Sequence, residues 1–405
     1  MSILNVNKIN PVGGGSTITI AGIASVTSSV TAPSFVGAVT GNVTGNVTGN
    51  VTGNVTGDAT GLSGNPSINT TGIVTATSFV PTVGQLSHRN VIINGAMLIS
   101  QRGTSSTTSG YATVDRFAVQ FGGTDEAATQ AQVDVASGTS PYTNGFRKAL
   151  KITNGNQSSG AGAADYIRYR IRLEAQDIAN SGWNYTSSSS YITLSFWIKS
   201  SVAQNFYGRL QTQDGTTYNF PFETGSLSAD TWTKITKVIP GQSNVTFSAG
   251  IGFGLQFQLW AFLGTNYTAS GVSLNQWAGF SSGTRTPDNT ATWYETNDAT
   301  LELTGVQLEV GSHASDFDFL SNSDELKRCQ RYYQQLPTSG DHVMWGFGRA
   351  EGNSARVQIP LSVPLRASPT ITCSNNRSVK YDATMVQSTS TPTVFKWDDD
   401  MSCII

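Results

Sequence analysis

Residues 191–200 read YITLSFWIKS, and this stretch decides the fold expected for the central part of the chain. Four apolar residues, Ile192, Leu194, Phe196 and Ile198, occupy every second position. A period of two is that of a β-strand, whose successive side chains point to opposite faces. The stretch therefore predicts a strand with one face buried in a core.

Similar stretches surround this strand, separated by polar, Gly- and Ser-rich segments. They include ADYIRYRIRLE (164–174), TWTKITKVI (231–239), GIGFGLQFQLWAFL (250–263) and ATLELTGVQLEV (299–310). Many short strands within roughly 230 residues are typical of a single β-sandwich or jelly roll. We predict an all-β fold with this sandwich at 89–322, a short helix at 323–337 capped by Ser323, and a small C-terminal β domain at 338–405.

The part of the chain before residue 88 has a different composition. Its only charged residues are Lys8 and Asp58, and its only aromatic residues are Phe35 and Phe79. From residue 39 it repeats VTGN, so that an extended strand would carry valine and glycine on one face and threonine and asparagine on the other. A single strand of this kind buries too little apolar surface to offset its backbone entropy.

Three such strands around a threefold axis could bury their valines against one another, so residues 36–88 predict an extended trimeric β stalk. The residues expected in the trimer core are Val39, Val43, Val47, Val51, Val55, Phe35 and Phe79. A flexible Gly/Thr/Asn linker is the alternative. The regular spacing of valine favours the stalk, since a linker does not require it.

Charge and cysteine content argue against several classes of partner. The net charge is −2 and charged residues make up 12% of the chain, so we expect no nucleic-acid partner. No apolar run approaches the roughly 18 residues of a spanning helix, so we expect no membrane insertion. The three cysteines lack metal-ligand spacing, and neither a metal nor a cofactor is expected. The N-terminus lacks the pattern of a secretory signal, which indicates synthesis in the cytoplasm.

No motif of a known catalytic site is present. The chain has 3 histidines and no nucleophile elbow, HExxH motif or phosphate-binding loop. Glu302 and Glu309 lie on one expected strand, but their odd spacing predicts opposite faces, which would prevent a hydrolytic pair. We therefore expect no catalytic residues and no enzyme activity.

Aromatic residues in polar, loop-like contexts are the candidates for glycan binding, because a flat ring can pack against sugar C–H groups. These candidates are Trp183, Tyr185, Tyr267, Trp277, Trp293 and Tyr294. The alternative is that half or more of them cover the sandwich core. Trp197, Trp232 and Trp260 lie within expected strands and are assigned to the core.

Several segments resemble bacteriophage tail-fibre proteins, especially those of cyanophages. GIVTATSFV and the VTGN array resemble their shafts, and PLRASPTIT resembles a C-terminal fibre segment. NVIINGAMLISQRG with VDRFAV resembles the start of a jelly-roll module in such fibres, and VQLEVGSHASDFDF with DELKRCQRYY resembles its end. The matching positions are Asn94, Gly95, Gln101, Arg102, Gly103, Asp115, Arg116, Phe117, Gln307, Leu308, Glu309, Gly311, Glu325, Leu326, Cys329, Gln330, Arg331, Tyr332 and Tyr333.

This resemblance implies a homotrimeric fibre in the tail of a virion, made in the host cytoplasm. Residues 1–35 would attach it to a phage tail or adaptor protein, and the jelly roll and tip would bind a glycan or receptor on the host surface. The middle module is also similar to carbohydrate-binding β-sandwiches, which often hold calcium through an Asp that is replaced by Ala96 here. A purely structural fibre or decoration protein and a polysaccharide-depolymerising tailspike are the alternatives.

Overall fold

The computed structural model describes residues 88–335, 347–351, 354–370, 377–381, 384–388 and 403–404. All of them belong to one of the two units into which the chain divides, residues 76–405. The predicted attachment segment (1–35) and all of the predicted stalk except His88 lie outside the described residues. The trimer-core calls, from Phe35 to Phe79, therefore stay predictions.

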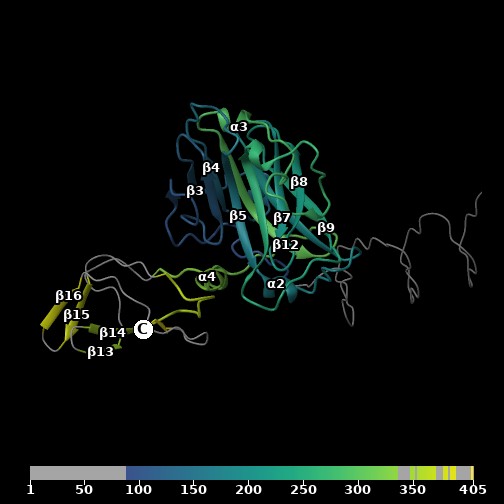
Figure 1. Cartoon of the computed structure of the whole chain (residues 1–405). Helices are drawn as coiled ribbons and strands as arrows, with labels where there is room; N and C mark the ends of the chain where they lie inside the picture. Colours follow the sequence, from purple (N-terminus) through teal and green to yellow (C-terminus); the bar gives the residue numbers. More distant parts are fainter. Residues whose placement is uncertain are drawn as a thin grey trace, which may run out of the picture. The chain divides into compact units, whose positions relative to one another are not determined.

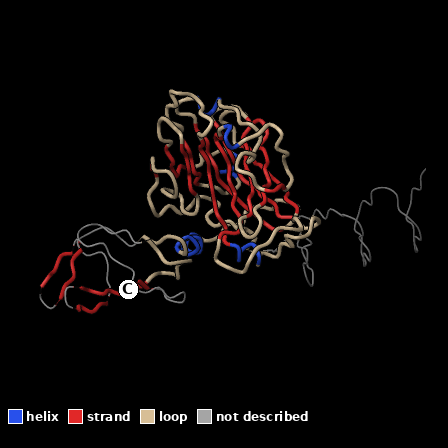
Figure 2. The backbone as a smooth tube through the Cα atoms, viewed as in Figure 1, coloured by secondary structure: helices blue, strands red, loops and turns tan. Residues whose placement is uncertain are grey.

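Two antiparallel six-stranded sheets form the body of the described chain, as predicted (Figures 1 and 2). The first sheet has the order β1 (Ser105–Ser106), β3 (Thr129–Asp134), β4 (Lys148–Thr153), β12 (Thr300–Val310), β6 (Tyr191–Ser200) and β9 (Thr233–Pro240). The second has the order β11 (Ala278–Gly279), β8 (Tyr218–Ser226), β7 (Asn205–Thr212), β10 (Phe253–Leu263), β5 (Tyr166–Glu174) and β2 (Ala118–Gly122).

Short helices and further strands complete the described elements. The helices are α1 (Ser140–Thr143), α2 (Ala175–Ala179), a 3₁₀ turn (Thr265–Tyr267), α3 (Thr292–Glu295) and α4 (Asn322–Gln330). The later strands are β13 (Phe347–Glu351), β14 (Ser354–Pro360), β15 (Arg377–Tyr381), β16 (Thr384–Ser388) and β17 (Cys403–Ile404). The chain therefore has the all-β architecture that the strand patterns indicated.

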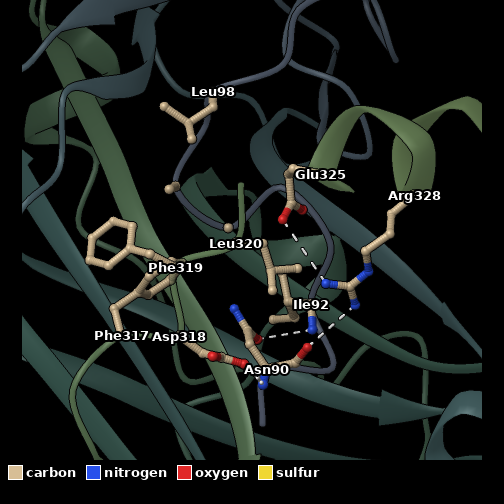
Figure 3. A pocket seen from close by; sticks show the side chains of 11 residues that line it. Asn90, Ile92, Leu98, Phe317, Asp318, Phe319, Leu320, Glu325 and Arg328 are labelled. Atoms are coloured by element: carbon tan, nitrogen blue, oxygen red, sulfur yellow. Dashed lines mark hydrogen bonds and ion pairs between the residues drawn. The ribbon is translucent and has the colours of Figure 1, made fainter. Parts of the chain in front are cut away.

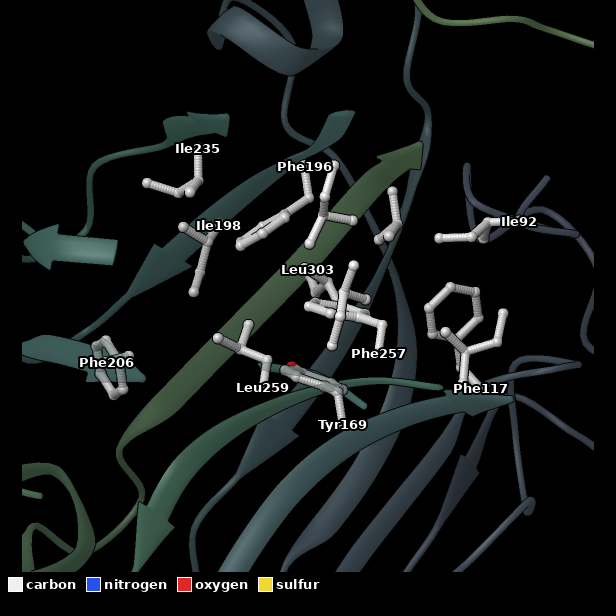
Figure 4. Packing of buried hydrophobic residues seen from close by; sticks show 14 of the residues in the cluster. Ile92, Phe117, Tyr169, Phe196, Ile198, Phe206, Ile235, Phe257, Leu259 and Leu303 are labelled. Atoms are coloured by element: carbon white, nitrogen blue, oxygen red, sulfur yellow. The ribbon is translucent and has the colours of Figure 1, made fainter. Parts of the chain in front are cut away.

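The core lies between the two sheets, where their inward-facing side chains form one cluster (Figure 4). Phe196 of the first sheet packs against Phe257 of the second, with ring centroids 5.5 Å apart. Phe222 stacks on Phe257 at 6.3 Å. The four apolar residues of the 191–200 stretch are all fully buried, which confirms the face that their spacing predicted.

Helix α4 begins one residue before the predicted range 323–337 and ends already at Gln330, and the predicted cap at Ser323 is wrong. The N-cap is Ser321, whose hydroxyl oxygen accepts a hydrogen bond from the backbone N–H of Asp324 at 3.2 Å. A capping oxygen serves the N–H groups two or three residues further on. Ser323 is already inside the first helical turn, so it cannot take that position.

Candidate functional site

The motif residues that resemble phage fibres form a closing network that joins the start of the sandwich to its end. The backbone N–H of Asn94 donates to the Glu325 carboxylate, and the Asn94 side chain bridges the carbonyl oxygens of Ile99 and Asp115 at 2.8 and 2.9 Å. A Cβ atom at Gly95 would lie 2.0 Å from the Val306 oxygen, so only glycine fits there.

Stacked arginines continue the closing network toward the end of the module. Arg102 pairs with Asp115 at 3.1 Å and places its guanidinium carbon 3.5 Å from the centroid of the Tyr333 ring. Arg116 lies 3.4 Å from the Tyr332 ring centroid. These motif residues contact one another, so they stabilise the fold and do not point toward a ligand.

Glu174 is a buried member of this network. Both of its carboxylate oxygens accept hydrogen bonds from Arg331, each at 3.0 Å, and the Tyr332 hydroxyl donates to it as well. Burial alone would raise the pKa of Glu174, but the hydrogen bonds from Arg331 and Tyr332 outweigh burial and lower it. A carboxyl with a lowered folded-state pKa stabilises the fold above its unfolded pKa and loses that effect as the pH falls.

We expect Glu174→Gln to lower the free energy of unfolding at pH 7 by about 1–3 kcal/mol, because charged hydrogen bonds are lost. The difference from the parent protein should shrink as the pH falls below about 4.5, where the unfolded carboxyl becomes protonated. Chemical unfolding at several pH values measures this. The control Glu302→Gln breaks an ion pair with Lys199 whose side chain is 25% exposed, and should cost under about 1 kcal/mol. A pH-independent difference for Glu174→Gln would contradict the assignment.

Figure 3 shows a small cavity within the closing network, lined by residues that include Asn90, Phe319 and Glu325. Its volume is about 10 Å³. A space of that size accommodates about one water molecule. It is therefore a packing void and does not offer room for a sugar.

A larger cleft of about 440 Å³ lies beside the closing network, between His88–Val91, α2 and α4. Its arginines already have carboxylate partners. Arg331 pairs with Glu174, Arg328 lies 4.0 Å from Glu325, and Arg89 lies 4.0 Å from Glu309. The positive charge in this cleft is therefore largely balanced within the fold.

Three of the six predicted glycan-binding aromatics are core residues. Trp183, Trp293 and Tyr294 are 3%, 0% and 1% exposed. Buried rings present no face to a sugar, so the prediction is wrong for these three. Asp165 accepts a hydrogen bond from the Tyr294 hydroxyl at 2.9 Å, which gives this buried hydroxyl a partner.

The other three candidates, Tyr185, Tyr267 and Trp277, are half-buried. Tyr185 packs edge-on against Phe247 with centroids 5.0 Å apart. Trp277 packs on Phe220 at 5.3 Å and donates its indole N–H to the Pro240 carbonyl oxygen at 2.7 Å. Tyr267 lies over the outer face of the second sheet. The guanidinium carbon of Arg285 lies 4.3 Å from the centroid of its ring.

Glu302 and Glu309 point to the same face of the first sheet, contrary to the expectation from their odd spacing. A β-bulge between Thr304 and Gln307 shifts the register of β12 against β6 and restores the alternation. Along the strand the two residues are separated by about 20 Å, far beyond the 5–9 Å of a hydrolytic carboxylate pair. They therefore do not form such a pair.

The outer face of the second sheet carries a group of polar and aromatic side chains. Core residues of β10 alternate with Gln256, Gln258 and Trp260, which therefore point away from the core. The same alternation holds for the neighbouring strands. The outward residues are Asn219 and Glu223 of β8, Tyr207, Arg209 and Gln211 of β7, and Tyr166, Arg168, Arg170 and Arg172 of β5.

Strand pairing places these residues in rows that cross the sheet. Gln258 is opposite Arg209 on one side and Arg170 on the other. Trp260 is opposite Tyr207 and Arg168. Trp260 is fully buried as predicted, but on this outer face and not between the sheets, because Arg209 covers its ring at 5.3 Å.

Buried polar atoms without partners gather on this outer face. In the described part of the chain, six buried side-chain nitrogen or oxygen atoms have no hydrogen-bond partner. Four of the six are here: Arg170 Nε, Arg285 Nε, Trp260 Nε1 and Gln256 Oε1. An unpartnered buried polar group is costly, and a concentration of such groups indicates a missing ligand or solvent.

The segment 264–290 forms one border of this face. Asn219 donates to the Arg285 carbonyl oxygen at 3.0 Å, and Phe280 N–H donates to the Thr217 carbonyl oxygen at 3.0 Å. The Phe280 ring lies 5.1 Å from the Arg209 guanidinium carbon. Half-buried rings of Tyr166, Tyr207 and Phe280 thus stand beside hydrogen-bonding side chains, the combination that sugar binding needs.

Other kinds of site find no support among these residues. The described residues contain no group of three His, Cys, Asp or Glu side chains that could hold a metal ion. Ala96, which replaces the expected calcium ligand, is buried in an apolar cluster with Phe146 and Trp232. No helix in the described ranges is both long and apolar enough to cross a membrane.

Several solved structures resemble part of the chain at low similarity, whereas no known family profile and no curated protein sequence matches it. The enzymatically active domain of tailspike protein 4 of bacteriophage CBA120 is 8% identical over 55% of this chain, with a TM-score of 0.29, and the match covers only 21% of that domain. A putative sugar-binding protein of Bacteroides thetaiotaomicron is 13% identical over 55% of this chain and 100% of its own length, with a TM-score of 0.28. The N-terminal cellulose-binding domain of Cellulomonas fimi β-1,4-glucanase C is 11% identical over 54% and 99%, with a TM-score of 0.26.

Proposed function

We propose that this chain is a non-enzymatic, glycan-binding fibre protein that binds a host-cell surface through the outer face of its second sheet. One observation carries the proposal. Four unpartnered buried polar atoms lie on this face, beside half-buried aromatic rings. Sugar hydroxyls both donate and accept hydrogen bonds, so a glycan bound over the half-buried Tyr166, Arg170 and Tyr207 would add hydrogen-bond partners to a face that lacks them.

The fibre architecture is a proposal from the sequence. In an extended strand the VTGN array would present a narrow valine face that a threefold stalk would bury. The chain would thus be a homotrimer in the tail of a phage particle, with residues 1–35 bound to a tail or adaptor protein. Three copies would also strengthen attachment to a repeating surface polymer through avidity.

Binding of the full-length protein to an array of bacterial surface polysaccharides tests the proposal. We expect binding to at least one polysaccharide, with no release of reducing ends on prolonged incubation. Release of reducing ends would identify a depolymerising tailspike. Absence of binding to any polysaccharide or to host cells would leave a structural virion protein and reject the proposal.

A further inference from the structure

The outer face of the second sheet holds an unusual concentration of positive charge. Arg168, Arg170 and Arg172 lie at every second position of β5 and are spaced about 7 Å apart. Arg209 lies two strands away across β10, and Arg285 reaches the same face from segment 264–290. We call these five residues the arginine face. The net charge of the whole chain, by contrast, is only −2.

None of the ion pairs among the described residues involves the arginine face. The partners of these arginines are uncharged: Arg168 donates to Gln120 at 2.9 Å, and Arg209 donates to Gln258 at 2.7 Å. Arg102 and Arg331 of the closing network, in contrast, pair with the carboxylates of Asp115 and Glu174 at 3.1 and 3.0 Å. Five arginines without an ion-pair partner thus gather on one face of the described sandwich.

Acidic groups near this face already have partners in the fold. Glu223 accepts a hydrogen bond from the Asn205 amide at 2.8 Å, and Asp288 accepts one from the Thr268 hydroxyl at 2.7 Å. Neither forms an ion pair with the arginine face in the described structure. Their negative charge therefore leaves most of the positive charge uncompensated.

The arginines also destabilise one another's charged state. Burial and then the positive charge of Arg170 lower the pKa of Arg168 to about 10. Burial, followed by the charges of Arg285 and Arg168, lowers the pKa of Arg209 well below its ordinary range. Buried like charges without counterions are unfavourable, and an anionic ligand would relieve the repulsion.

We infer that the ligand of this face is an acidic polysaccharide whose uronic acid carboxylates bind Arg168, Arg170 and Arg172, while Arg209, only 2% exposed, adds positive charge beneath them. A guanidinium donates two parallel hydrogen bonds that match the two oxygens of a carboxylate. A line of three arginines along one strand offers repeated contacts, which suits a polymer with charges at intervals better than a single anion. This inference rests on the proposed function and specifies its ligand class.

The affinities of the full-length protein for polygalacturonate and for its methyl ester test this inference, because the two polymers share a backbone and differ in charge. At about 50 mM salt we expect the acidic form to bind at least about tenfold more tightly. That advantage should fall at about 500 mM salt, where charges are screened. Calorimetry or affinity electrophoresis measures both affinities.

Paired variants locate the effect on the sheet. We expect the double variant Arg168→Gln, Arg170→Gln to bind the acidic form no more tightly than the methyl ester, at an unchanged melting temperature. The control Lys151→Gln, Lys234→Gln removes two positive charges from the outer face of the first sheet and should change affinity less than about twofold. A melting temperature that fell with the arginine double variant would assign these residues a structural role and overturn the inference.

Two outcomes separate this inference from the proposed function. Equal affinity for the acid and the ester, or binding only to neutral polysaccharides of the array, would reject the acidic ligand and leave glycan binding intact. Failure to bind any polysaccharide would reject both.

Discussion

Replacing Val39, Val43, Val47, Val51 and Val55 by serine is expected to abolish the trimer and to yield monomers or aggregates. The reason is the VTGN array, in which an extended strand would place all five valines on one face. Serine keeps the side chain small but removes both valine methyl groups. Each valine that loses burial costs about 1.5 kcal/mol or more, and five valines on each of three chains contribute together.

Mass photometry of the full-length protein measures this effect directly. The matched control replaces the five threonines that directly follow those valines by serine. These residues lie on the polar face of the same strand, so the trimer should persist. A parent protein that is monomeric while its chain is intact, or a valine variant that stays trimeric, would favour the flexible linker over the stalk.

Phe257→Ala is expected to be the most destabilising single substitution in the sandwich. The Phe257 ring is fully buried and contacts Phe196 and Phe222, so its removal leaves a cavity between the sheets. Truncation of a buried phenylalanine costs about 3–5 kcal/mol. For a domain of this size that corresponds to a fall in melting temperature of about 10 °C.

The control for this substitution is Val238→Ala. Val238 is 41% exposed on the outer face of β9, so its truncation should change stability by less than about 0.5 kcal/mol. Calorimetry of both variants gives the comparison. Equal melting temperatures for Phe257→Ala and the parent would mean that the two sheets do not share the core described above.

The strands and their buried faces could be predicted because alternation is a local property. Ile192, Leu194, Phe196 and Ile198 share a face in any extended strand, whatever the rest of the chain does. The helix could also be predicted from local sequence, because a capping serine is followed by acidic and then by basic residues. Its cap was missed because Ser321 and Ser323 are both suitable residues, and only the path of the chain decides between them.

The predicted side-chain orientations are wrong where packing in three dimensions, and not the neighbouring sequence, decides which way a residue points. Trp293 and Tyr294 stand in a polar, loop-like sequence, yet α3 turns both rings into the core. Glu302 and Glu309 share a face because Gly305 has a φ of 63° and lies in the bulge between them. Neither the turn nor the bulge follows from residue spacing.

The arginine face had a signal in the sequence that was overlooked. YIRYRIRLE alternates apolar residues with Arg168, Arg170 and Arg172, which places three like charges on one face of a strand. Its connection to Arg209 and Arg285 depends on the strand order, which is a long-range property. The site could therefore be assembled only from the pairing of β5, β10 and β7.

Hydrogen exchange with and without a saturating bound polysaccharide tests the location of the site most directly. We predict slower exchange in segment 264–290, which contains β11 and borders the arginine face. Exchange in β9, the edge strand of the other sheet, should be unchanged. Slowing confined to β9, or to the cleft beside the closing network, would contradict glycan binding at the outer face of the second sheet.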